Sequence, residues 1–270
     1  MSALIASLKP APRTLVGLVA TLKPLASTAA GVTPESLAAL QQAVGAVEAR
    51  DRPRSWSCGP SRGRFIVFEG LDRSGKSTQS KRVVEYLKSR ERGVQWMCFP
   101  DRSTLSGQVL DLYLRRQVDL PDDLVHLLFS ANRWEVAEKI VAVLQSGTSI
   151  CCDRYAFSGV VYTAAKGLDF RWCQLPDRGL PRPDGVFFMH VRPEEGAKRA
   201  AFGDERYEHA VFQQRVREQF ESAGFGKDVN WNVVDGSRGI EEIGAEISAK
   251  VEKLFEVPGE PELPALWLEV

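Results

Sequence analysis

Short apolar runs alternate along the chain with longer segments in which apolar positions recur every three or four residues. The short runs are rich in β-branched and aromatic residues and predict buried strands, whereas the longer segments predict helices. The predicted strands are residues 65–69, 94–99, 148–152, 185–191 and 231–234. The predicted helices are residues 77–90, 106–114, 124–145, 156–165, 193–199, 210–223 and 240–255. This alternation predicts right-handed crossovers and an α/β fold, with a five-stranded, doubly wound parallel sheet flanked by helices.

A complete phosphate-binding motif, G-x-x-x-x-G-K-[ST], follows the first predicted strand and leads into the first predicted helix. Its glycines let backbone N–H groups surround phosphate oxygens, and the helix N-terminus adds its positive end. Lys76 can reach the β- and γ-phosphates, and the Ser77 hydroxyl can ligate Mg²⁺. The motif therefore predicts a nucleoside triphosphate site, formed by Gly70, Ser74, Gly75, Lys76, Ser77 and Thr78.

Acidic and basic residues follow three of the predicted strands, where an open parallel sheet places its ligands. An arginine fork suits a phosphate group, and an aspartate after an apolar strand can hold Mg²⁺ or orient a reacting oxygen. Any one such pair could instead be an ordinary surface ion pair. Asp72 and Arg73 stand in the phosphate loop itself, and the two pairs beside it, Asp101-Arg102 and Asp153-Arg154, together predict a second phosphate site.

The predicted helix 124–145 and the segment 198–208 add two further candidate features. Phe129 and Arg133 are four residues apart and project from one helix face, so a ring could stack on a planar base while the guanidinium bonds its edge. Phe129 alone would more commonly be a core residue. Residues 198–208 carry alternating charges with Gly203 as a hinge, which suits a short lid, although a solvated charged loop is the alternative.

Composition narrows the class of protein. Of the 270 residues, 44% are hydrophobic and 26% are charged, which is typical of a globular protein rather than a disordered or membrane-embedded one. The 35 basic residues balance 35 acidic ones, and this zero net charge argues against bulk nucleic-acid binding. We therefore expect neither a nucleic acid nor a membrane as partner.

The first 62 residues differ in character from the rest. Residues 1–34 contain Lys9, Arg13 and Lys23 but no acidic residue, as organelle transit peptides do. A secretory signal or a tail without function is the alternative. Residues 33–50 suit a helix, and the prolines and glycines of residues 51–63 predict a linker. We expect an N-terminal extension over residues 1–62 and a folded domain with a C-terminal tail over residues 63–270.

Together the motifs resemble the thymidylate kinase family, whose members phosphorylate dTMP to dTDP with ATP. The matching runs are residues 68–79, 99–102, 126–135, 153–159, 179–184 and 202–208. The resemblance implies a P-loop NTPase fold of the nucleoside monophosphate kinase type with a short lid. It also implies ATP and dTMP as substrates, Mg²⁺ as cofactor and a homodimer. The extension leaves the compartment open between a mitochondrion or other organelle and the cytoplasm.

The resemblance implies which residues act on the nucleotide. Arg73, carried by the phosphate loop as in the eukaryotic branch of the family, would stabilise charge on the transferring phosphoryl group. Lys76 and Asp153 would be the other catalytic residues, and Ser77 and Asp153 would hold Mg²⁺. Arg199 and the loop after the last strand would border adenine. The implied ATP-binding residues are Gly70, Arg73, Ser74, Gly75, Lys76, Ser77, Thr78 and Arg199.

The resemblance also implies an acceptor site for dTMP. Phe129 would stack on thymine while Arg133 reads its edge, and Asp72 would accept a hydrogen bond from the 3′-hydroxyl. Arg102 and Arg154 would hold the acceptor phosphate. The implied substrate-binding residues are Asp72, Phe99, Arg102, Phe129, Arg133, Arg154, Gly159, Tyr162 against the sugar and Tyr207 in the lid.

Two other functions remain open on the sequence alone. A deoxynucleoside kinase has a similar phosphate loop, but its neutral acceptor would make Arg102 beside Arg154 superfluous. A nucleotide-binding switch or scaffold without turnover would have less reason to keep Arg73, Lys76, Ser77 and Asp153 together.

Overall fold

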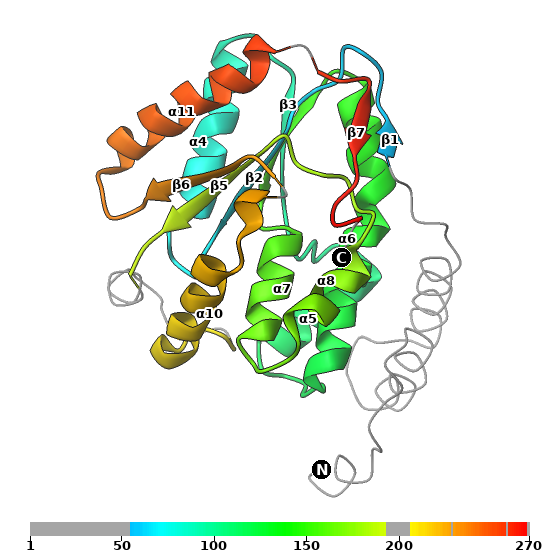
Figure 1. The fold of residues 1–270 in the computed structure, drawn as a ribbon, viewed down its shortest axis with the longest axis vertical. Helices are drawn as coiled ribbons and strands as arrows, with labels where there is room; N and C mark the ends of the chain where they lie inside the picture. Colours follow the sequence, from blue (N-terminus) through cyan, green and yellow to red (C-terminus); the bar gives the residue numbers. More distant parts are fainter. Residues whose placement is uncertain (1–54, 193–205, 228, 258, 269–270) are drawn as a thin grey trace, which may run out of the picture.

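A twisted parallel sheet forms the centre of the protein (Figure 1). The computed structural model describes residues 55–192, 206–227, 229–257 and 259–268. The sheet contains five strands in the spatial order β3-β4-β2-β5-β6, and every neighbouring pair is parallel. This confirms the sheet that the sequence predicts. The strands are β2 (Phe65–Gly70), β3 (Val94–Cys98), β4 (Ser149–Asp153), β5 (Gly185–His190) and β6 (Trp231–Asp235).

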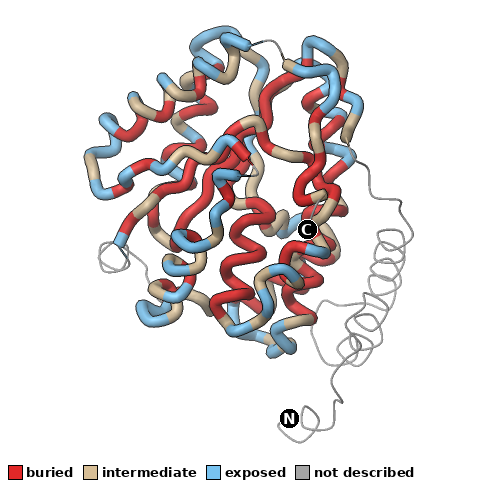
Figure 2. The backbone as a smooth tube through the Cα atoms, in the orientation of Figure 1, coloured by how far each residue is buried: buried red, intermediate tan, exposed pale blue. Residues whose placement is uncertain are grey.

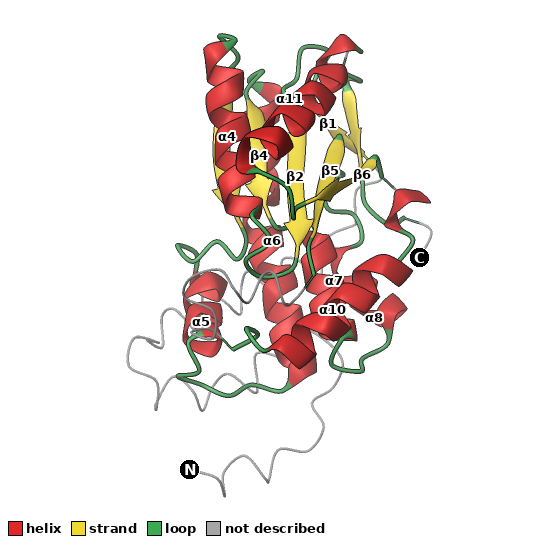
Figure 3. Cartoon of the chain, turned by 90° about the vertical axis from the view of Figure 1, so that its left-hand side faces the viewer, coloured by secondary structure: helices red, strands yellow, loops and turns green. Residues whose placement is uncertain are grey.

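Helices cover both faces of the sheet (Figure 3). One face packs against α4 (Lys76–Ser89) and α11 (Ile240–Glu256). The other packs against α6 (Asp122–Gln145) and α7 (Ala156–Ala164). The other helical elements of the described residues are α5 (Leu105–Leu114), α8 (Phe170–Gln174) and α10 (Ala210–Ser222) and the short 3₁₀ turns η2 (Leu175–Asp177) and η3 (Phe225–Lys227).

Buried residues run through the sheet and the inner helix faces (Figure 2). Strand β2 lies in the middle of the sheet, and its side chains alternate between two cores because successive residues of a strand face opposite sides. Ile66 and Phe68 point toward α4 and α11, whereas Phe65 and Val67 belong to the core on the α6 side. Burial on both faces explains why β2 reads as a continuous apolar run.

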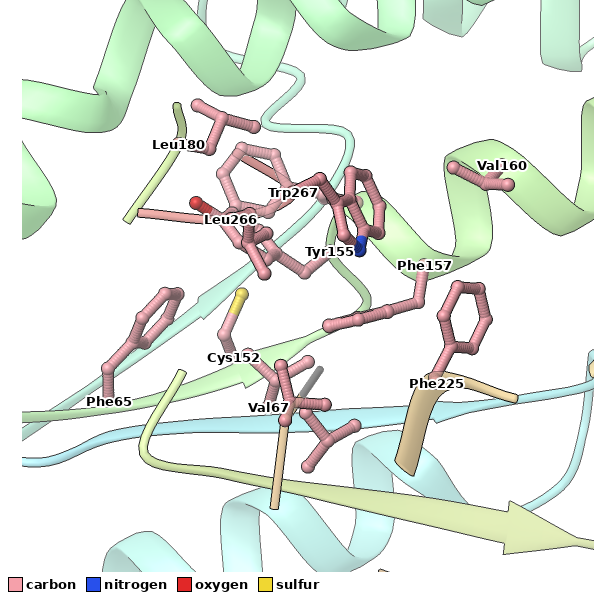
Figure 4. Packing of buried hydrophobic residues seen from close by; sticks show 14 of the residues in the cluster. Phe65, Val67, Cys152, Tyr155, Phe157, Val160, Leu180, Phe225, Leu266 and Trp267 are labelled. Atoms are coloured by element: carbon pink, nitrogen blue, oxygen red, sulfur yellow. The ribbon is translucent and has the colours of Figure 1, made fainter. Parts of the chain in front are cut away.

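The core on the α6 side is rich in aromatic rings from distant segments (Figure 4). The Phe157 ring contacts Phe225 edge-on, with centroids 5.0 Å apart, and Trp267 near the C-terminus, with centroids 5.6 Å apart. Edge-to-face pairs of this kind add stability beyond the apolar area that they bury. Trp267 is thereby fixed to the same core that supports β4 and α7.

Residues just before the sheet belong to the folded unit, and for residues 55–63 the linker prediction is wrong. Strand β1 (Ser55–Ser57) pairs antiparallel with β7 (Glu262–Pro264) beside α6 (Figure 1). Trp56 donates its indole N–H to the Gly179 carbonyl at 3.0 Å, and Arg62 forms a bidentate ion pair with Asp184. The pairing of β1 with β7 joins segments 207 residues apart in the sequence, and a local pattern carries no signal for it.

Other predicted segments fall partly or wholly outside the described residues. The possible helix 33–50, the predicted helix 193–199 with Arg199, and residues 198–205 of the predicted lid lie there. Short elements at residues 170–174 and 175–177, absent from the prediction, connect α7 to β5. Within the described part of the chain, no helix is both long and apolar enough to span a membrane.

A chain starting at Ser61 is expected to be less stable than one starting at Arg54, by about 2–4 kcal/mol, because it loses the burial of Trp56 and the β1 hydrogen bonds. Urea unfolding of the two chains measures this difference. Both chains should keep kcat and KM within about threefold, because the truncated segment precedes β2 whereas the phosphate loop follows it. Equal stability of the two chains would show that β1 contributes nothing to the fold.

Candidate active site

A cavity of about 940 Å³ surrounds the phosphate loop at the carboxyl end of β2. The loop contributes Asp72 through Gln79, and Asp153 and Arg154 at the end of β4 form another part of the wall. Gly236 and Arg238, from the loop after β6, also line it. We call this space the larger cavity. Of the residues predicted to bind the triphosphate, Arg73, Ser74, Gly75, Lys76, Ser77 and Thr78 line it.

Gly70 lies behind the larger cavity and fixes the shape of the loop. Its φ is 141°, and a Cβ there would lie 2.6 Å from the Met189 carbonyl oxygen on β5 and 2.9 Å from the Ser74 hydroxyl. Only glycine permits so close an approach of the loop to the neighbouring strand. The Gly70 carbonyl in turn accepts a hydrogen bond from Arg154 at 3.0 Å. Gly70 therefore shapes the site without lining it.

Lys76 is buried at the first turn of α4. Its ammonium donates to the Leu71 carbonyl and lies 3.3 Å from the Ser74 hydroxyl, so it connects two positions of the loop. Burial, reinforced by the positive charge of Arg154, lowers the pKa of Lys76 from its usual 10.5 to about 8. A phosphate group would reverse this shift, because an anion favours the charged ammonium.

ATP affinity should therefore fall above pH 8, approaching tenfold per pH unit. The sign follows because the bound phosphates raise the pKa of Lys76, so that above the free-enzyme pKa a proton must be taken up on binding. Calorimetric titration of ATP between pH 7 and pH 9.5 measures the effect. An affinity that stays flat to pH 9.5 would contradict a proton uptake by Lys76.

Ser77 and Asp153 lie side by side in the wall of the larger cavity, and the Ser77 hydroxyl donates to Asp153 Oδ2. Asp153 Oδ1 is buried and has no hydrogen-bond partner among the described residues. An unsatisfied buried carboxylate oxygen is costly unless something else pairs with it. Mg²⁺ in phosphoryl-transfer sites takes one or two protein oxygens and completes its shell with phosphates and water. The donors present fit that ion.

Arg73 stands in the loop with φ 61°, in the left-handed region that most residues avoid. Its Nε donates to Glu208 Oε1 at 3.0 Å, and its side chain is 33% exposed while that of Glu208 is 7% exposed. The arginine therefore lies over the larger cavity with its orientation fixed by a residue just before α10. Glu208 falls in the predicted lid segment, but the sequence pattern does not predict its contact with Arg73.

A smaller cavity of about 140 Å³ adjoins the larger one. Asp72, Phe99, Pro100, Arg102 and Arg154 line both cavities, so the two share a wall. Each predicted substrate-binding residue lines the smaller cavity, namely Asp72, Phe99, Arg102, Phe129, Arg133, Arg154, Gly159, Tyr162 and Tyr207. Phe129 is only half-buried, unlike its neighbours in α6, so it is not a fully buried core residue.

Arg154 connects the phosphate loop with the smaller cavity. It follows β4 with φ 67°, and its guanidinium donates to Asp72 Oδ1 and to the Ser158 hydroxyl at 3.1 Å. The guanidinium also lies 5.2 Å from the centroid of the Tyr162 ring, within reach of a cation–π contact. Gln213 on α10 holds Asp72 from the other side, donating to Oδ2 at 2.7 Å. Two residues of the shared wall, Asp72 and Arg154, are thus held in place by contacts within the protein.

Glu69, at the end of β2, supports the same wall from below. Its buried carboxylate accepts hydrogen bonds from the backbone N–H groups of Tyr155 at 2.9 Å and Ser158 at 3.1 Å. It also accepts a hydrogen bond from the Ser158 hydroxyl. Burial raises the pKa of Glu69. Because no side chain of α7 caps its own first turn, Glu69 takes that part and orients Arg154 and the residues that follow.

Comparison with known proteins decides the family. The model of the thymidylate kinase family matches residues 68–247. The thymidylate kinase of zebrafish (Danio rerio) is 42% identical over 207 residues, which cover 76% of this chain and 98% of the relative. The chain belongs to the thymidylate kinase family. The human thymidylate kinase is 44% identical with the same coverage.

A solved thymidylate kinase structure supports the same family assignment. The thymidylate kinase from Candida albicans superimposes with a TM-score of 0.70 at 35% identity, covering 76% of this chain and 99% of the yeast chain. The region matched by the thymidylate kinase family model includes the loop and both cavities, whereas β1 and β7 lie outside it. The fold of the family is therefore present here with its site residues at one end of the sheet.

Proposed function

We propose that this chain transfers the γ-phosphoryl group of ATP to dTMP, giving dTDP and ADP. The observation that carries the proposal is the shared wall, where Arg102 and Arg154 stand between the phosphate loop and the smaller cavity. A phosphate group held there would face the γ-phosphate directly. Two anions brought together in this way need cationic groups between them, which this wall supplies.

The chain's own residues supply alignment and charge neutralisation, which is most of what phosphoryl transfer requires. Lys76 would hold the β- and γ-phosphates, and Arg73 would follow the charge that develops on the transferring group. Arg154 would hold the acceptor phosphate in line with it. Asp72, whose carboxylate is already held by Arg154 and Gln213, would accept a hydrogen bond from the 3′-hydroxyl of deoxyribose.

The smaller cavity suits a nucleotide with a pyrimidine base. Phe129 supplies a ring for stacking, and Arg133 supplies hydrogen-bond donors to a base edge. The Tyr162 hydroxyl is buried without a hydrogen-bond partner among the described residues, so a sugar oxygen could satisfy it. Tyr207 closes the far side, with its ring edge-on to Tyr162 at 5.6 Å between centroids.

Mg²⁺ belongs to the proposal as the cofactor that Ser77 and Asp153 would hold. Held there, it would supply positive charge against the charge of the phosphates. The support is the unpartnered Asp153 Oδ1 beside the Ser77 hydroxyl. Chelation of Mg²⁺ should abolish turnover, and Asp153→Asn should raise the Mg²⁺ concentration needed for half-maximal rate.

An assay of ADP release with dTMP, dUMP, dGMP and thymidine as separate acceptors tests the function. The proposal expects the highest kcat/KM with dTMP and little turnover with thymidine, because an uncharged acceptor leaves Arg102 and Arg154 without a phosphate. Preference for thymidine would identify a nucleoside kinase instead. ATP binding with no turnover on any acceptor would identify a switch or scaffold.

The compartment and the assembly are also proposals. We propose import into a mitochondrion or another organelle, supported by the absence of acidic residues in residues 1–34. Residues 1–35 fused to a fluorescent protein should direct it there, and a diffuse cytosolic signal would count against import.

We further propose a homodimer, which sedimentation at micromolar concentration would distinguish from a monomer.

A further inference from the structure

Arg133 lies in α6 at the inner end of the smaller cavity, and its side chain is only 2% exposed. Its Nε donates to Asp177 Oδ1 at 3.0 Å and its Nη2 donates to Asp177 Oδ2 at 2.6 Å. Asp177 is completely buried in the turn η2, and it also accepts the Ser130 hydroxyl at 2.8 Å. A two-point ion pair of this kind fixes the plane of a guanidinium as well as its position.

The same guanidinium lies against α7. A Cβ at Gly159 would lie 2.7 Å from Nη2 and 3.0 Å from Nη1, so only glycine lets the helix come so close. Within the described residues, Nη1 has no protein hydrogen-bond partner. Arg133 and Gly159 both line the smaller cavity, whereas Asp177 does not. Because Asp177 takes Nε and Nη2, Nη1 is the guanidinium nitrogen of Arg133 that is left to meet a base in that cavity.

The charge of the pair matters as much as its geometry. Asp177 neutralises Arg133, so the inner end of the cavity carries hydrogen-bond donors without a net charge to attract a second phosphate. An arginine can only donate, and its N–H groups suit a ring carbonyl but not an exocyclic amino group. A donor fixed in this orientation would distinguish thymine from cytosine.

We propose that Asp177 is a positioning residue for base recognition. It acts through Arg133, turning the free edge of the guanidinium toward the base, and Gly159 leaves the room for that orientation. The inference rests on the proposed function, because it assumes dTMP in the smaller cavity. Asp177 itself touches no ligand, so its effect must appear in the binding of the base and not in the handling of ATP.

Asp177→Asn tests the proposal, because asparagine has the size of aspartate but carries an amide in place of the carboxylate. The amide either turns its own N–H groups toward Arg133 or accepts only one of the two hydrogen bonds that Arg133 now donates. The expected result is a rise of at least tenfold in KM for dTMP, with kcat and KM for ATP changed less than threefold. The inhibition constant of deoxyribose 5-phosphate, which lacks a base, should stay unchanged. Asp169→Asn is the matched control, because Asp169 caps α8 nearby and asparagine caps equally well.

Equal weakening of dTMP and of deoxyribose 5-phosphate would overturn the proposal, because it would show a general structural role. An unchanged KM for dTMP would also overturn it. If Asp177→Asn does not fold, Ser130→Ala is the second variant, because it removes one hydrogen bond to the same carboxylate. It should raise KM for dTMP two- to fivefold and leave the inhibition constant of deoxyribose 5-phosphate unchanged. If KM for dTMP does not rise in Ser130→Ala, the proposal is refuted. A wild-type enzyme inactive on dTMP would instead refute the proposed function itself.

Discussion

Arg73→Ala is expected to lower kcat at least about 100-fold while changing KM for ATP and dTMP much less. Arg73 stands over the larger cavity and can follow the charge that develops on the transferring phosphoryl group, whereas Lys76 is fixed beneath the loop. Arginines that act in this way contribute about 10³–10⁵ in kcat in other phosphoryl-transfer enzymes. Steady-state kinetics of the variant, with both substrates varied, measure the loss.

The alternative is that Arg73 serves only as the ion-pair partner of Glu208. A pair with one partly exposed member contributes little, so kcat would then fall less than tenfold. Arg206 cannot replace Arg73 in this structure, because its guanidinium donates to the carbonyls of Tyr113 and Val118 and to Asp119. Arg90→Ala, at the exposed C-terminal end of α4, is the control for loss of an arginine elsewhere.

Arg154→Ala is expected to lower kcat/KM for dTMP by about 10²–10³, mainly through KM. The substitution removes a fork that joins the phosphate loop to the acceptor side, and it leaves the carboxylate of Asp72 without its cationic partner. An acceptor phosphate would then lie near the negative carboxylate of Asp72 without the positive guanidinium of Arg154. Titration of dTMP into the variant, followed by kinetics, separates binding from turnover.

Arg154→Lys keeps the positive charge but not the planar fork, and it should recover only part of the loss. Full recovery by lysine would mean that charge alone matters and that the contacts to Gly70 and Ser158 do not. Unchanged dTMP affinity in Arg154→Ala would contradict the placement of the acceptor phosphate. A changed melting temperature without a change in kinetics would mean that Arg154 has only a structural role.

The parts of the site that could be predicted from the sequence were predictable for one physical reason. Lys76 and Ser77 belong to a motif whose spacing is dictated by a phosphate group, and β2 reads as apolar because both of its faces are buried. Arg154 and Asp153 directly follow an apolar run, and parallel strands bring such ends to one edge of the sheet. In these cases local sequence and function impose the same pattern.

The parts that could not be predicted depend on partners far away in the sequence. Asp177 lies 44 residues from Arg133, and Gln213 lies 141 residues from Asp72, with no motif to connect them. The pairing of β1 with β7 joins residues that are more distant still. Each contact is decided by packing of the whole chain, which composition and periodicity over short windows do not encode.

The most direct test of the central claim follows the label from [γ-³²P]ATP in the presence of dTMP and Mg²⁺. The account predicts that label appears in dTDP in a one-to-one ratio with ADP, with little free phosphate, and that dTMP is the preferred acceptor. Label that appears only as inorganic phosphate, or that passes to thymidine in preference to dTMP, would contradict it.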